Sequence, residues 1–239
     1  MLVALTIATL PTLCPNLQVI YLCPLPRDLM IIAAVSNMLL TCSPNTLWCI
    51  DVDSLLTEEA CDMISRLPDL CQLLVVIEKG ASLPSVVLPN LTNLAINWNH
   101  DSDLFWMFHG ATFGKLEVIT FNSTFKPTND FRSICDFLET FDRVMLAVSA
   151  QNTLSEFYFH TSCSCNPNYS SLLPFTQLRY LIIGSSCGDG CTSRVDDDII
   201  TNLTQVMPEL EILLLGDMPC HEILTGVTVK VLVVLAHHC

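Results

Sequence analysis

The chain has 239 residues, of which 51% are hydrophobic and only 14% are charged. Its formal net charge is −14, from 24 acidic and 10 basic residues, and it contains no basic run and no basic–aromatic strip. This balance argues against nucleic acid as a partner and suits basic partners instead. No stretch reaches the ~18 consecutive apolar residues that a membrane-spanning helix needs, so we expect no membrane partner either.

The first residues are apolar, but they lack the pattern of a secretory signal. Residues 1–10 have no basic start and run directly into the lead-in of a strand. The 13 cysteines are odd in number and spread along the chain, and several, such as Cys49, Cys61 and Cys71, stand where a small core residue would serve. We therefore expect reduced, buried thiols and a cytoplasmic or nuclear protein.

A short phrase containing Pro-x-Leu returns four times, each time before a compact apolar run. Its proline should end the preceding helix, because proline lacks a backbone donor and disfavours the helical conformation of the residue before it. A returning phrase indicates a repeat architecture. The four prolines are Pro15, Pro68, Pro89 and Pro208.

The pattern Leu-x-x-Leu-x-Leu, with any large apolar residue accepted at each position, fits eight places, and we call its three positions the slots. Successive first leucines lie from 21 residues (Leu70 to Leu91) to 38 residues (Leu116 to Leu154) apart, and most spacings are near the roughly 20–29 residues of a leucine-rich repeat. The second and third slots point to one side of a strand, where stacked neighbours bury them together. The eight sets are Leu17/Ile20/Leu22, Leu47/Ile50/Val52, Leu70/Leu73/Val75, Leu91/Leu94/Ile96, Leu116/Ile119/Phe121, Leu154/Phe157/Phe159, Leu178/Leu181/Ile183 and Leu210/Leu213/Leu215.

This pattern predicts an α/β fold: a leucine-rich-repeat solenoid, or horseshoe, with parallel strands on its concave face and helices on its convex face. We expect residues 1–239 to form a single irregular array of about eight units. The chain stops at His238-Cys239, where a ninth strand should begin, and neither end has the polar cap that solenoids need. We therefore expect the array to be truncated at both ends.

Helices should fill most of the longer spacings, and polar or glycine-rich segments should form loops. Thr57 and Asp196 are placed to cap helix starts. The helices are expected at residues 1–13, 28–42, 57–66, 129–148, 196–207 and 227–238. Loops are expected at residues 97–103, 122–129, 161–174 and 184–190, and residues 76–88 are too short and too rich in Ser and Pro for a long helix.

The leucine-rich repeats with their x-Pro-x-Leu lead-ins, together with the helix start Asp196-Asp-Asp-Ile199, resemble the repeat regions of fungal F-box proteins. Residues 226–230 and 235–239 are similar to a helix lead-in of those arrays. The resemblance implies the substrate-recruiting arm of a ubiquitin ligase, whose F-box binds a Skp-type adaptor. The repeats begin by residue 17 and leave no room for an F-box of ~40 residues. A Skp-type adaptor is therefore expected only if an F-box lies upstream.

Four loop cysteines are the best metal candidates, because thiolates favour zinc in four-ligand sites. Their Cys-x-Cys and Cys-x-x-x-Cys spacings are not strongly typical of zinc, so structural thiols are favoured over a metal site or disulfide. Three acidic residues at 196–198 are more consistent with helix capping than with cation binding, and the terminal His237-His-Cys239 lacks partners. No catalytic motif is present, so we expect no enzyme and no cofactor. The four cysteines are Cys163, Cys165, Cys187 and Cys191.

The residues that flank the second slot should point to solvent on the concave face. Several are tyrosines or large apolar residues, a composition typical of partner-binding surfaces. We predict a protein–protein interaction module; the alternatives are that neighbouring units or a flanking segment cover this face, and that the chain is a non-catalytic scaffold or a gene fragment without independent function. The predicted partner-binding residues are Tyr21, Asp51, Leu74, Asn93, Glu156, Tyr158, Tyr180, Ile182 and Leu214, with Val19, Val118 and Ile212 beside them.

Overall fold

The computed structural model describes residues 2–22, 25, 28–77, 87–98, 112–123, 150–161, 169–185 and 195–217, apart from the side chains of residues 54, 58, 77, 87, 98, 112, 123, 161, 185, 216 and 217. The chain divides into two compact units, Met1–Leu116 and Glu117–Cys239. We call them the N-terminal unit and the C-terminal unit, and each is described by itself below. The expectation of a single array over residues 1–239 stays a prediction.

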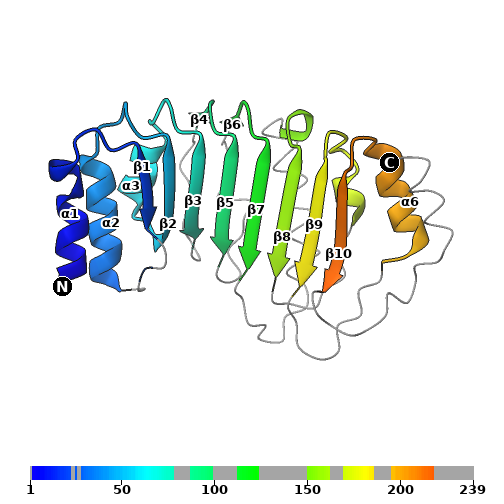
Figure 1. Cartoon of the computed structure of the whole chain (residues 1–239), viewed down its shortest axis with the longest axis horizontal. Helices are drawn as coiled ribbons and strands as arrows, with labels where there is room; N and C mark the ends of the chain where they lie inside the picture. The colour runs from blue at the N-terminus through cyan, green and yellow to red at the C-terminus, as the bar shows by residue number, and fades with distance from the viewer. Residues whose placement is uncertain are drawn as a thin grey trace. The chain divides into compact units, whose positions relative to one another are not determined.

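Eight strands form a parallel sheet whose order, β1-β2-β3-β5-β7-β8-β9-β10, follows the chain. This confirms the α/β class and the parallel strands. The N-terminal unit contains β1 (Val19–Leu22), β2 (Cys49–Leu55), β3 (Gln72–Ile77) and β5 (Asn93–Trp98) (Figure 1). The C-terminal unit contains β7 (Val118–Ser123), β8 (Glu156–Thr161), β9 (Tyr180–Ser185) and β10 (Ile212–Asp217).

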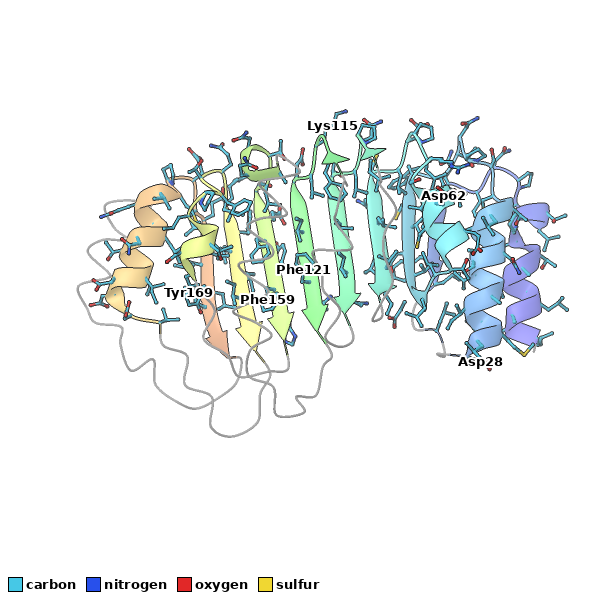
Figure 2. All side chains as sticks on the ribbon, turned by 180° about the vertical axis from the view of Figure 1, so that it is seen from behind. Asp28, Asp62, Lys115, Phe121, Phe159 and Tyr169 are labelled. Atoms are coloured by element: carbon cyan, nitrogen blue, oxygen red, sulfur yellow. The ribbon has the colours of Figure 1, made fainter. Side chains whose placement is uncertain are left out.

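Every one of these strands begins two residues after the first leucine of a slot pattern, as the repeat predicts. All slot residues of the six inner patterns are buried, and those of the first and last patterns are buried or half-buried. In the C-terminal unit Phe121 packs edge-to-face on Phe157, with ring centroids 6.3 Å apart. The slots therefore form the core, on the side of the sheet that we call the covered face. Figure 2 shows Phe121 and Phe159 on this side, with α3 and η2 in front of the strands of their own units.

Three of the turns that precede a strand use their backbone groups in the same way. The Leu17, Leu91 and Leu210 N–H groups each donate to the carbonyl three residues earlier, at 3.1–3.3 Å. This closes a four-residue turn in which the repeated proline holds the second position, where its fixed φ is favoured. The proline thus ends the preceding element and shapes the entry into the strand.

One carbonyl per turn then accepts two successive N–H groups from the next turn. The Gln18 carbonyl accepts from Trp48 and Cys49, at 3.0 and 3.4 Å, and the Trp48 carbonyl accepts from Cys71 and Gln72, at 2.8 and 3.1 Å. The same arrangement recurs at the carbonyls of Cys71, Glu117, Ser155 and Arg179. This shared carbonyl sets the register of each strand on its neighbour.

The helices begin at the polar residues that the sequence offers. Asp28 caps α2 (Leu29–Thr41) by accepting from Met30 N at 2.8 Å, and Thr57 caps α3 (Glu58–Ile64) by accepting from Ala60 N at 3.4 Å. Asp196 caps α6 (Asp197–Val206) by accepting from Ile199 N at 2.9 Å. Together with α1 (Leu2–Leu13), these confirm four of the expected helices.

Several details differ from expectation or lie beyond the described residues. Gly184 and Ser185 belong to β9 and not to a loop, because the residues at the ends of β8 and β10 pair with them. Thr161 likewise ends β8, and the segment expected as a loop after it contains the short helix η2 (Tyr169–Leu172). Three short elements were not predicted: η1 (Ala150–Asn152) and the paired strands β4 (Val87–Leu88) and β6 (Thr112–Phe113). The helices expected at residues 129–148 and 227–238 lie outside the described residues.

The Phe121–Phe157 contact predicts a large difference between the two faces of the sheet. We expect Phe157→Ala to lower the free energy of unfolding by about 3–5 kcal/mol, because it opens a cavity in a fully buried site. Ile212→Ala, at a position that is 45% exposed on β10, should cost less than about 1 kcal/mol. Urea unfolding of the two variants measures both, and equal losses would contradict the assignment of Phe157 to the core.

Candidate partner-binding face

The opposite side of the sheet, which we call the open face, carries the residues that alternate with the slots. All nine predicted partner-binding residues stand at these alternating positions in their strands. Tyr21 is the most exposed of them, at 69%, and the other eight are half-buried. Val19 and Ile212, at 42% and 45%, are also exposed there. Strand alternation therefore placed these residues correctly, while their binding role stays a prediction.

The register brings these residues into rows that run across each unit. In the N-terminal unit Tyr21 pairs with Asp51, and Asp51 pairs with Leu74. In the C-terminal unit one row contains Glu156, Tyr180 and Ile212, and the next contains Tyr158, Ile182 and Leu214. Because neighbouring strands lie about 4.8 Å apart, the side chains within a row are in reach of one another.

The N-terminal unit presents two carboxylates on the open face of β2. Asp53 Oδ1 accepts a hydrogen bond from Asn97 Nδ2 at 3.5 Å. Asp51 Oδ1 is buried and accepts no hydrogen bond from the described residues. Burial raises the pKa of Asp51, and the nearby Asp53 raises it further. Strands β1, β2, β3 and β5 carry no Lys, Arg or His, so they supply no cation to compensate.

Cys49 stands next to this pair on the same strand, and its thiol is poorly suited to nucleophilic chemistry. The side chain is buried, and its Sγ donates to Gln72 Oε1 at 3.5 Å. Burial raises the pKa of Cys49, and Asp51 and Cys71 add to the effect. A thiol with a raised pKa stays protonated at neutral pH and is a weak nucleophile and metal ligand.

In the C-terminal unit the tyrosines of the open face are held by carboxylates. Tyr158 donates from its hydroxyl to Glu156 Oε2 at 2.8 Å, and Tyr180 donates to Glu211 Oε2 at 2.9 Å. Arg179 Nε donates to Glu211 Oε1 at 2.8 Å, and the guanidinium lies 5.8 Å from the centre of the Tyr180 ring. Burial and the hydrogen bond to Glu156 raise the pKa of Tyr158 to about 12. Both hydroxyls are thus engaged, and the aromatic rings are fixed in place.

Sequence reasoning missed four residues that shape these rows. Asp53 stands two residues after Asp51, and Asn97 stands four residues after Asn93, so both also alternate with the slot residues. The strand alternation that placed Asp51 and Asn93 on the open face could therefore have found them. Arg179 stands one residue before β9, and Glu211 stands one residue before β10. The Glu211 N–H donates to the Arg179 carbonyl, which is one of the shared carbonyls. No periodic signal distinguishes their side chains, and only the strand register shows that they face each other.

The metal candidates are not brought together within the described residues. Cys163, Cys165, Cys187 and Cys191 lie outside those residues, as does the terminal 237–239 segment. Where side chains are described, no three His, Cys, Asp or Glu residues are grouped closely enough to hold a metal ion. Asp196 acts as a helix cap, as predicted. Cys14, Cys42, Cys49 and Cys71 carry free thiols.

Comparisons with known proteins give no assignment. No protein-family model, no curated protein and no solved structure matches this chain. Among the described residues, no helix is both long enough and apolar enough to cross a membrane.

The raised pKa of Asp51 predicts how this residue affects stability with pH. The folded state holds the Asp51 proton more tightly than the unfolded state, so stability is lost as pH rises through the folded pKa. We expect Asp51→Asn to raise the free energy of unfolding at pH 7 and to have a smaller effect near pH 3. Urea unfolding at both pH values tests this. A variant that is less stable than the parent at pH 7 would contradict it.

Proposed function

We propose that this chain is a non-catalytic protein-interaction module that holds a protein partner on the open face of its sheet. The observation that carries the proposal is the set of fixed aromatic and apolar side chains on β8, β9 and β10. Tyr158 and Tyr180 are held by carboxylates, and Ile182 and Leu214 stand beside them in the same rows. Rigid aromatic residues next to apolar ones supply contact area at a low entropic cost, as in many protein interfaces.

The finer architecture that we propose is a leucine-rich-repeat horseshoe whose open face is concave. The eight slot patterns, the parallel strands in chain order and the recurring shared carbonyl support it. In such an array each unit buries its apolar side on its neighbours, so the alternating side remains available along the whole sheet. An extended surface of this kind suits a macromolecular partner better than a small molecule.

The narrowest form of the proposal is substrate recognition for a ubiquitin ligase. It rests on the x-Pro-x-Leu lead-ins and the Asp-rich helix start, which resemble those of fungal F-box proteins. In this chain Asp196 of that segment caps α6. Reading the full-length transcript from both ends tests this form separately. An F-box encoded upstream would support it, and its absence would remove the ligase role while leaving the interaction module intact.

Affinity capture with matched variants tests the interaction module itself. The full chain is used to capture partners from a cell extract, and each partner is then purified and its Kd measured. We expect Tyr158→Ala and Tyr180→Ala to weaken binding by about tenfold or more, because each removes a fixed ring from the contact surface. Tyr158→Phe and Tyr180→Phe keep the rings and should bind within a few-fold of the parent.

Gln205→Ala, at an exposed position on α6, controls for effects unrelated to the open face. Urea unfolding of every variant shows whether a loss of binding accompanies a loss of folding. If both alanine variants remain folded and bind as tightly as the parent, the open face of the C-terminal unit is not the contact surface. A parent chain that captures no partner would contradict the proposal as a whole.

A further inference from the structure

We infer that the open face of the N-terminal unit binds an arginine side chain of a basic peptide segment, seated between Tyr21, Asp51 and Leu74. The inference rests on the proposed function and specifies the chemistry of the partner. It concerns strands β1, β2 and β3 only.

The three residues form one row of the sheet. Tyr21 on β1 pairs with Asp51 on β2, and Asp51 pairs with Leu74 on β3. The row therefore places an aromatic ring, a carboxylate and a branched apolar side chain on three neighbouring strands. Tyr21 is 69% exposed, so its ring is accessible to a partner.

The Asp51 carboxylate receives no hydrogen bond within the described part of the chain. A binding partner could supply the missing hydrogen-bond donor. The Asp51 Oδ1 atom is buried and accepts no hydrogen bond from the described residues, whereas Asp53 accepts one from Asn97. Strands β1, β2, β3 and β5 contain no cationic residue, and the whole chain has a net charge of −14. A buried oxygen without a donor, on strands that carry no cation, is complementary to a positively charged donor.

Arginine fits this row better than lysine or an apolar residue does. Its guanidinium is planar, stacks on aromatic rings and donates two parallel hydrogen bonds to one carboxylate. Its hydrocarbon stem packs on apolar surface while the charged end reaches a polar partner. Tyr21 offers the ring, Asp51 offers the carboxylate, and Leu74 offers the apolar surface.

The C-terminal unit does not offer the same site. Glu156 already accepts from Tyr158, and Glu211 is bound by both Tyr180 and Arg179. These two carboxylates therefore have donors within the chain, and Arg179 lies beside the Tyr180 ring. Among the described residues of the open face, only Asp51 in the N-terminal unit has a buried carboxylate oxygen without a donor.

Selection from a phage library of random 12-residue peptides, with the full chain as bait, tests the inference. We expect the enriched peptides to contain arginine, and the best of them is then synthesised for fluorescence anisotropy. Asp51→Asn should weaken its binding on the order of 10- to 100-fold, as expected for the loss of a hydrogen bond to a charged group. Replacing the peptide arginine with citrulline should have a similar effect, and replacing it with lysine should have a smaller one.

Two matched controls separate the site from general charge attraction. Asp69→Asn removes the same charge at an exposed turn and should leave binding unchanged. Tyr21→Ala should weaken binding, whereas Tyr21→Phe, which keeps the ring, should not. Equal losses in Asp51→Asn and Asp69→Asn would show non-specific attraction to an acidic protein and would overturn the inference.

The outcome also distinguishes this inference from the proposed function. If the enriched peptides lack arginine, bind equally to Asp51→Asn and lose affinity in Tyr158→Ala, the arginine site is wrong and the interaction module stands. If the parent chain enriches no peptide at all, both are contradicted.

Discussion

The shared carbonyl at the entry to strands β2, β3, β5, β8, β9 and β10 is the contact on which the rest of the sheet depends. It accepts two successive N–H groups from the next turn, so the donors of two residues that precede or open a strand are satisfied together. A slip of one residue would leave these donors unpaired and would turn every slot residue toward solvent. The same bond that stacks the turns therefore decides which side chains form the core and which form the open face.

The two units use their open faces differently, although the backbone pattern is the same. In the C-terminal unit Glu156 and Glu211 accept hydrogen bonds from the two tyrosine hydroxyls of the open face. In the N-terminal unit Asp51 is held without a donor among the described residues, next to a second carboxylate. An unpaired carboxylate that costs stability is easier to explain by a role in binding than by a role in folding.

The sequence predicted the strands well because one strong signal, the slot leucine, fixes where each strand begins. It also placed Tyr21, Asp51 and Tyr158 on the correct face, because strand alternation requires nothing beyond that register. It did not predict that Asp53 accepts a hydrogen bond and Asp51 Oδ1 does not, because the donor to Asp53 is Asn97, which stands two strands away on β5. Gly184 was expected in a loop because glycine is common in turns, but pairing to both neighbouring strands extends β9 through it. The pairing of Arg179 with Glu211 could not be found for a similar reason: it joins residues 32 positions apart, and no local pattern marks either side chain.

Amide hydrogen exchange measured by NMR tests the central role of the shared carbonyl most directly. The N–H groups of Cys71, Thr92, Ser155, Arg179 and Glu211 precede their strands, yet each donates to a shared carbonyl at 2.8–2.9 Å. The account predicts that these five amides are protected from exchange as strongly as the amides inside the strands. Exchange of these amides at the rate of an unfolded chain, with the strands still protected, would contradict it.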